Sequence, residues 1–194
     1  MPGLWPGDRA AAPAATALHA AVHRVQGEGR GGQALMSLRL RQPLLWAALV
    51  LVLDFFTKRL VLANIEALRA KVSVIGDLVR FIYVRNSGSA MGLFPVGRVV
   101  LVGVSLATTA VLVFLFLRTS AELVWRRTAL ALILGGALGN LIDRIFYDGM
   151  VVDFIDLGIG VHRFYTFNVA DMGVTIGGVI LFMCLLLDGR DSHE

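Results

Sequence analysis

The segment VVLVGVSLATTAVLVFLFL, residues 99–117, contains no charged side chain over its nineteen residues. At a rise of about 1.5 Å per residue, a helix of this length spans close to the ~30 Å hydrocarbon core of a bilayer. Three further apolar segments of similar length lie on either side of it, at residues 43–62, 128–147 and 169–187. The pattern predicts an all-α, multi-pass membrane protein with four transmembrane helices.

The composition agrees with a membrane protein and excludes several other classes. Of the 194 residues, 57% are hydrophobic and 16% are charged, whereas soluble domains contain about 45–50% and about 25%. The net charge of +4 is modest, and no basic stripe with aromatic platforms indicates nucleic-acid binding. The single cysteine, Cys184, lies in an apolar run, where a thiol more often packs than reacts.

The first 35 residues differ from the rest of the chain. They are rich in Ala, Gly and Pro, and they contain no apolar stretch that could span a membrane or form a signal core. Met36 is followed by a short basic segment and then by the first apolar run. We expect Met36 to be the working start and residues 1–35 to be a disordered or misannotated extension; a short regulatory tail is the alternative. Residues 36–190 then form the transmembrane domain, and 191–194 a C-terminal tail.

Four spans would place both termini on the same side of the membrane. Short basic flanks mark the cytoplasmic side, and five arginines lie next to the predicted spans on the side of the termini: Arg39, Arg41, Arg118, Arg126 and Arg127. The opposite loops also contain basic residues, so the bias is incomplete. We assign the termini to the cytoplasm.

The outer loop between the first two spans, about residues 63–98, is long for a simple connection. Residues 71–75 and 78–85 contain β-branched and aromatic side chains in partial alternation, with Gly76 and Asp77 between them. This pattern predicts a small β-element on the outer membrane surface. The following stretch, residues 86–92, is typical of a turn or flexible loop.

The predicted topology brings most of the membrane-embedded polar side chains to one leaflet. These are Asp54, Lys58, Asn86, Asn140, Asp143, Arg144, Asp153 and Asp171. Ionisable residues within spans are costly and usually face the interior of a bundle or a cavity. Their clustering at one depth predicts a functional site.

Each residue also has a purely structural interpretation. Asp54 and Lys58 have i,i+4 spacing, which is typical of an ion pair at a helix end. Asn168 and Asp171 have the spacing of a helix N-cap and its acidic third residue. Asp153, in Val-Val-Asp-Phe, has no such capping role, so its carboxylate needs another partner.

Other residues of the third and fourth spans support packing or recognition. Asn140 and Arg144 share one helix face and could donate hydrogen bonds to a peptide backbone. Asp143, beside Arg144, also fits a purely structural role. Small residues spaced four apart, which let helix backbones approach, occur on both spans: Gly135 and Gly139, and Gly173 and Gly177.

Two neighbouring carboxylates cannot both ionise easily, so they share a proton and can act as base and acid on one water. Asp171, at a helix N-terminus, is expected to ionise more readily because the helix dipole favours negative charge there. Asp153, in a more apolar setting, would hold the proton. Ser87 and Ser89 lack an evident activating base, and His162 is the only histidine in the outer loops.

Five sequence blocks resemble the signature blocks of lipoprotein signal peptidase (signal peptidase II). They occur in the family's order, and the resemblance covers about residues 38–187. The blocks are DFFTK at 54–58, NSGSAMG at 86–92, GGALGNLIDR at 135–144, VVDF at 151–154 and FNVAD at 167–171. Two positions depart from the family pattern: Met91 stands where Phe is frequent, and Met172 where Ser is common.

The resemblance implies an aspartic endopeptidase of the bacterial inner membrane. Such enzymes remove the signal peptide of diacylglyceryl-modified prolipoproteins, cleaving before the lipidated cysteine near the periplasmic face, without a metal or other cofactor. The β-element and the loop after it would form the family's periplasmic β-cradle and flap. Expected partners are the prolipoprotein, membrane lipid and the inhibitor globomycin.

The resemblance also implies a role for each site residue. Asp153 and Asp171 would be the catalytic dyad. Three residues match positions that contact substrate or globomycin: Asn86, Asn140 and Arg144. Five others would support the site: Asp54, Lys58, Gly88, Asp143 and Asn168.

Two other classes of protein were weighed against this interpretation. A small transporter with an acidic proton relay would need polar groups in both halves of the bilayer, and the inner half has almost none. A scaffold that binds a partner through its outer loops would leave Asp153 and Asp171 unexplained.

Overall fold

The computed structural model describes residues 41–88 and 97–191. The expectations for residues 1–35, for Met91 and most of the flap around it, and for the tail after residue 191 fall outside these described residues. All four predicted apolar segments are helical. The elements are a helix over residues 41–63, a short helix α2 (Ile65–Arg69), and the long helices α3 (Arg98–Arg118), α4 (Val124–Phe146) and α5 (Val169–Asp191).

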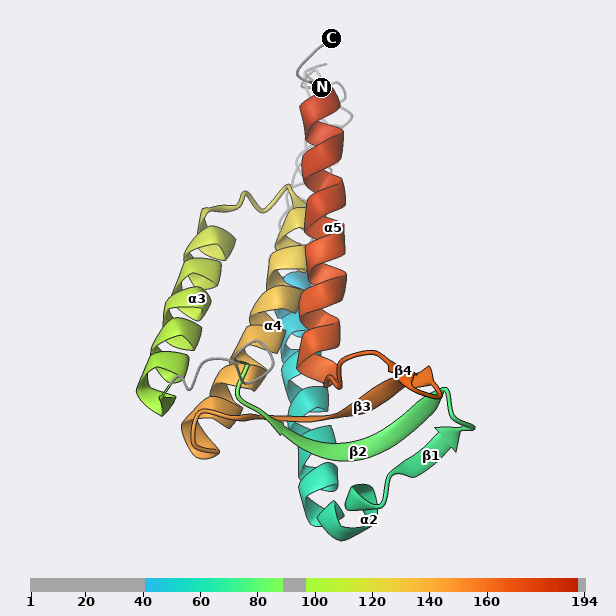
Figure 1. The fold of residues 1–194 in the computed structure, drawn as a ribbon. Helices are drawn as coiled ribbons and strands as arrows, with labels where there is room; N and C mark the ends of the chain where they lie inside the picture. Colours follow the sequence, from blue (N-terminus) through green and yellow to red (C-terminus); the bar gives the residue numbers. More distant parts are fainter. Residues whose placement is uncertain (1–40, 89–96, 192–194) are drawn as a thin grey trace, which may run out of the picture. The chain divides into compact units, whose positions relative to one another are not determined.

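Within the described residues, α3, α4 and α5 are long and apolar enough to cross a membrane. The helix over residues 41–63 is also long, but it carries Asp54, Lys58 and Arg59 in its second half. Helix α4 is the most buried of the long helices, and it packs against both α3 and α5 (Figure 1).

Glycines bring the helix backbones close together. A Cβ atom added to Gly177 of α5 would lie 2.6 Å from the carbonyl oxygen of Ala129 on α4. A Cβ on Gly136 of α4 would meet the carbonyl oxygen of Ala170 on α5. Gly135 of α4 faces Ala47 of the first helix, where a Cβ atom would lie 2.5 Å from the Ala47 carbonyl oxygen. These contacts require residues without side chains, because backbone oxygens occupy the space.

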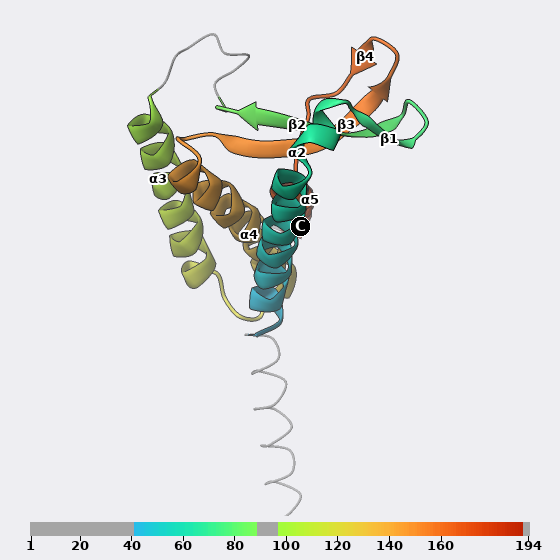
Figure 2. The ribbon, with the colours of Figure 1, turned by 90° about the horizontal axis from the view of Figure 1, so that it is seen from below.

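A four-stranded antiparallel sheet lies at the end of the bundle where α4 ends and α5 begins (Figures 1 and 2). Its strands, in spatial order, are β1 (Val72–Ile75), β2 (Val79–Asn86), β3 (Val151–Ile159) and β4 (His162–Arg163). The first two match the predicted β-element. The other two were not predicted, because residues 148–168 were read as a connection between spans.

Strand β3 is the inner part of the sheet. Its first four residues are buried, and Val152 and Phe154 share a core cluster with Val61 of the first helix and Leu68 of α2. Successive strand residues point to opposite faces, so Asp153 points away from this apolar cluster. Two buried aspartates, Asp153 and Asp156, interrupt its apolar residues, so β3 shows neither a regular alternation nor a continuous apolar run in the sequence.

Ion pairs join the two hairpins of the sheet. Asp156 on β3 is contacted by Arg80 of β2 and Arg163 of β4, each with a guanidinium nitrogen 2.8 Å from its Oδ2. Hydrogen bonds from Arg163, and then from Arg80, hold the pKa of Asp156 below its usual value despite desolvation by burial. Arg163 also donates to the carbonyl oxygen of Asp77 in the β1–β2 turn. The network fastens the strands that carry the site to the rest of the sheet.

Candidate active site

Asp171 lies in the first turn of α5 and belongs to a reciprocal capping arrangement. The side-chain oxygen of Asn168 accepts a hydrogen bond from the Asp171 backbone N–H at 2.9 Å, and Oδ2 of Asp171 accepts one from the Asn168 N–H at 3.1 Å. This is a capping box with an aspartate at its third position. The other carboxylate oxygen, Oδ1, accepts a bond from Asn140 at 2.9 Å. Capping therefore explains only half of the polar surroundings of Asp171.

Asp153 is buried on β3, with 1% of its surface exposed. Its Oδ1 accepts a hydrogen bond of 2.7 Å from the Asn168 side chain, and its Oδ2 accepts one of 2.8 Å from the Asn86 side chain. Asn168 thus contacts both aspartates. Desolvation by burial raises the pKa of Asp153 to about 6; the Asp171 charge adds to this, whereas the two amide hydrogen bonds oppose it.

Each of the three asparagine amides is held in one orientation by a second contact. The carbonyl oxygen of the Asn86 side chain accepts the Gly88 N–H at 2.8 Å, and that of Asn140 accepts from Lys58 Nζ at 3.0 Å. The oxygen of Asn168 is occupied by its capping bond. Because an amide presents donors only at its nitrogen, all three NH₂ groups must point toward the two carboxylates.

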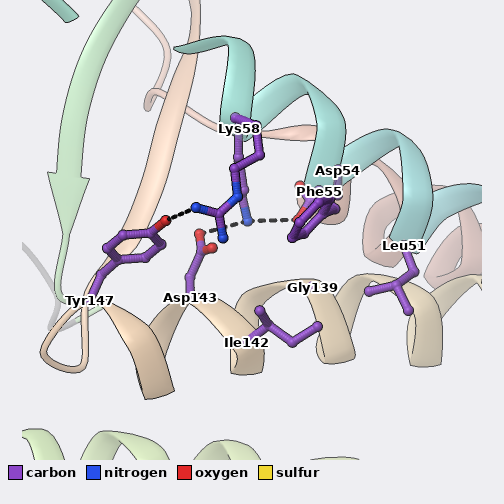
Figure 3. Close-up of a pocket in the computed structure, with 9 residues that line it drawn as sticks. Leu51, Asp54, Phe55, Lys58, Gly139, Ile142, Asp143 and Tyr147 are labelled. Carbon is purple, nitrogen blue, oxygen red and sulfur yellow. Dashed lines mark hydrogen bonds and ion pairs between the residues drawn. The ribbon is translucent and has the colours of Figure 1, made fainter. Parts of the chain in front are cut away.

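Behind these amides lies a buried charge cluster. Lys58 Nζ is 2.8 Å from Oδ2 of Asp54 and 2.9 Å from Oδ2 of Asp143, and all three side chains are buried (Figure 3). Asp54 and Lys58 are therefore the i,i+4 ion pair that their spacing predicts, but Asp143 joins them from α4. A cavity of about 10 Å³ beside Lys58 has room for about one water molecule.

Arg144 lies in the last turn of α4, next to Asp143 and one turn after Asn140. It is close enough to Asp171 and Asp153 for electrostatic attraction to both carboxylates. Gly88 comes so near that a Cβ there would lie 3.0 Å from Nη2 of Arg144, and Gly88 has a φ of +68°. Both the close approach and the left-handed backbone favour glycine at this position.

A groove of about 480 Å³ opens beside Asp171. Its lining is mainly apolar and comes from β3, the β4–α5 connection and α5: Leu157, Phe164, Phe167, Met172, Thr175 and Ile176. Met172 is thus a groove residue. The groove itself was not predicted, because its lining residues converge only once β3 and the β4–α5 connection are placed beside α5. The groove gives an apolar ligand access to the carboxylate of Asp171.

The structure brings all ten predicted site residues into this one region. The aspartates lie at the adjoining ends of β3 and α5, the three amides surround them, and the cluster of Lys58 lies behind. Chemically, the arrangement can hold two carboxylates, one of which has a raised pKa, next to an apolar groove. Its amide donors stabilise negative charge on both carboxylates.

Proteins named lipoprotein signal peptidase are similar to this chain along almost their whole length. That of Moorella thermoacetica is 40% identical over 152 residues, covering 78% of this chain and 97% of that protein. That of Brevibacillus brevis is 37% identical over 147 residues, covering 76% and 96%. A bacterial membrane enzyme solved in meso at 2.3 Å resolution superposes with a TM-score of 0.69 at 31% identity, over 77% of this chain and 90% of that one.

The family described as signal peptidase (SPase) II matches residues 46–187, which is most of the chain. This range contains both aspartates and all eight of the residues predicted to support them or to bind substrate. The family predicted from the five sequence blocks is confirmed: the chain belongs to the signal peptidase II family of bacterial membrane peptidases.

Proposed function

We propose that the protein is an intramembrane aspartic endopeptidase that removes the signal peptide from diacylglyceryl-modified prolipoproteins, cleaving before the lipidated cysteine. The observation that carries the proposal is the pairing of Asp153 and Asp171 around Asn168, with amide donors on all four carboxylate oxygens. The name of the relatives, lipoprotein signal peptidase, supports the class of substrate.

The two aspartates would divide the roles of base and acid. Asp171, ionised at the N-terminus of α5, takes a proton from a water molecule as the water oxygen attacks the scissile carbonyl carbon. Asp153, whose raised pKa favours the protonated form, donates its proton to the carbonyl oxygen. As the tetrahedral intermediate collapses, one of its hydroxyl groups returns a proton to Asp153, the C–N bond breaks, and the proton held by Asp171 passes to the leaving nitrogen. Both aspartates thereby regain their starting protonation states. The pair titrates as a unit.

We also propose how the chain is oriented in the membrane. The helix over residues 41–63 is the fourth span, with both termini in the cytoplasm of a bacterium and the sheet on the periplasmic face of its inner membrane. In that orientation the groove beside Asp171 opens at the level where a lipid-anchored substrate holds its scissile bond. Asn86, Asn140 and Arg144 would bind the substrate backbone, and globomycin would compete for the same place.

Cleavage of a diacylglyceryl-modified prolipoprotein by purified variants tests the dyad. We expect Asp153→Asn and Asp171→Asn each to lower kcat by about 10³-fold, because each removes one member of the acid–base pair. Asp148→Asn is the matched control. Asp148 makes an exposed ion pair with Arg98, and its positive φ of 58° is a conformation that asparagine adopts readily. Near-normal turnover by either folded dyad variant would rule out the assignment.

A further inference from the structure

Lys58 uses all of its hydrogen-bonding capacity inside the protein. An ammonium group has three N–H donors, and Lys58 Nζ has three acceptors within 3.0 Å: Asp54, Asp143 and Asn140. Only 3% of the residue is exposed. No donor is left over for a substrate, so Lys58 can influence the reaction only through these three partners.

Asp54, the first partner, connects Lys58 to α5, the helix that carries Asp171. Oδ2 of Asp54 contacts Lys58, and its Oδ1 accepts a hydrogen bond of 2.9 Å from the backbone N–H of Ala170. Ala170 directly precedes Asp171 in the first turn of α5. Asp54 therefore holds the backbone of that turn against the first helix. The contact requires Gly139 on α4, since a Cβ there would lie 2.5 Å from Asp54 Oδ2.

Asp143, the second partner, connects Lys58 to β3, the strand that carries Asp153. Oδ2 of Asp143 contacts Lys58 at 2.9 Å and also accepts the backbone N–H of Val152 at 3.0 Å. Val152 directly precedes Asp153 on β3. Asp143 therefore holds the strand at the residue next to the second aspartate.

Asn140, the third partner, bonds directly to the carboxylate of Asp171. Lys58 donates to the side-chain oxygen of Asn140, and the NH₂ group of Asn140 donates to Oδ1 of Asp171. A lysine cannot accept a hydrogen bond. A flipped Asn140 amide would therefore oppose its NH₂ group to the ammonium group and its oxygen to the carboxylate. Lys58 thus holds the Asn140 amide in the orientation that stabilises ionised Asp171.

We propose that Lys58 is the positioning residue of the dyad: it sets the placement of Asp153 relative to Asp171 by holding Asp54, Asp143 and Asn140. The inference rests on the proposed function, since it assumes that these two aspartates carry the chemistry. Through the side chain of Asn140, Lys58 is connected to Asp171 itself. Through Asp54 and Asp143, it is connected to the residue before each aspartate. A single buried cation thereby links the first helix, α4, β3 and α5 around the site.

A charge-neutral substitution of Lys58 tests the proposal. Lys58→Met retains the length of the side chain but removes all three donors. We expect kcat for the diacylglyceryl-modified prolipoprotein to fall by about 100-fold, because a displacement of about 1 Å in a reacting group has an effect of this size. KM should change far less, because Lys58 has no free donor for substrate. Arg59→Met is the matched control: the adjacent residue is exposed and donates to the Tyr147 hydroxyl, outside these routes.

A second variant tests the Asn140 route and answers the question if Lys58→Met does not fold. Asn140→Asp keeps an oxygen toward Lys58 but replaces the donor to Asp171 with a negative charge. The dyad would then retain its proton to higher pH, moving the acidic limb of the pH–rate profile upward by about one unit. The other charged groups around the dyad are unchanged in this variant: Asp54 and Lys58 of the first helix, and Asp143 and Arg144 of α4.

The outcomes separate this inference from the proposed function. Loss of cleavage in Asp153→Asn and Asp171→Asn supports the dyad whatever Lys58 does. A folded Lys58→Met enzyme with near-normal kcat, or with a defect only in KM, would overturn the positioning role while leaving the dyad intact. If Lys58→Met does not fold, an unshifted profile for Asn140→Asp would overturn it. If the unchanged enzyme fails to cleave the lipidated substrate, the proposed function fails first.

Discussion

At the scale of single residues, burial makes the stability of the folded protein depend on the protonation of Asp153. Its pKa is raised from 3.8 to about 6, chiefly by desolvation. The folded protein therefore binds a proton at Asp153 more tightly than the unfolded chain does. The resulting stability is fully present below about pH 4 and is lost as the pH rises through about 6, amounting to at most about 3 kcal/mol.

This linkage predicts how Asp153→Asn changes the pH dependence of thermal stability. In the unchanged protein, the contribution of Asp153 lowers Tm between pH 4 and pH 7, and the variant should lack that contribution because asparagine does not titrate. Thermal unfolding of purified protein in detergent, measured across this range, checks the prediction. Asp148→Asn, at an exposed position, should retain the slope of the unchanged protein. An equal slope in Asp153→Asn would contradict the raised pKa.

Gly88 and Asn168, which were predicted to support the site, each contact a residue beside the two aspartates or an aspartate itself. Gly88 fixes the Asn86 amide through its N–H and leaves room for Arg144. Asn168 caps α5 and bonds to Asp153 with the same side chain. The capping role expected from its spacing is confirmed, and the same side chain also contacts Asp153; its support of the reaction stays a prediction.

At the scale of elements, the contact between α4 and α5 holds the site together, because α5 carries Asp171 and α4 carries Asn140, Asp143 and Arg144. Adjacent glycines on α5 experience different surroundings at this contact. A Cβ on Gly177 would lie 2.6 Å from the Ala129 oxygen and 2.7 Å from an Ile133 side-chain carbon, whereas a Cβ on Gly178 would meet nothing within 4 Å.

Alanine substitutions at these two neighbours should therefore have opposite effects. Gly177→Ala should lower stability by about 1–3 kcal/mol, because the added methyl group forces the helices apart. Gly178→Ala should be neutral or slightly stabilising, because alanine is the better helix former and has free space. Thermal unfolding of both variants in the same detergent makes the comparison. Equal losses at both positions would show that the close α4–α5 contact does not hold.

At the scale of the whole molecule, the proposed topology places the sheet and the α3–α4 loop on opposite sides of the membrane. Val161, in the turn between β3 and β4, is 90% exposed. Ser120, in the loop between α3 and α4, is also exposed. The protein has one cysteine, Cys184, so a Cys184→Ala background allows each loop to be labelled separately.

A membrane-impermeant maleimide should label Val161→Cys in intact spheroplasts, whereas Ser120→Cys should react only after the membrane is opened. The reason is that four spans with cytoplasmic termini expose the sheet to the periplasm and the α3–α4 loop to the cytoplasm. Labelling of both cysteines after permeabilisation controls for accessibility. The reverse pattern would overturn the orientation, and with it the placement of the dyad near the periplasmic face.

The sequence by itself determined the helical segments and the set of polar residues that meet. Length and hydropathy are local properties, so residues 43–62, 99–117, 128–147 and 169–187 could each be read as helices from their own composition. In the proposed topology of four spans that alternate in direction, the helix ends that carry polar side chains fall at one depth. The two aspartates and the eight other predicted site residues follow from this common depth and from the five sequence blocks.

Only the tertiary structure decided how these residues are joined. Lys58 bonds to Asn140, 82 positions away, and Ala170 bonds to Asp54, 116 positions away; no local pattern specifies such partners. Strand β3 could not be predicted either, because its buried aspartates, Asp153 and Asp156, find their partners on other elements and interrupt the alternation that marks a strand. Packing of the helices and strands determines which polar groups become neighbours. Each buried donor then bonds to an acceptor that the fold places beside it. The sequence could thus predict the two aspartates as candidates for the site, but not the hydrogen-bond network centred on Lys58 beside them.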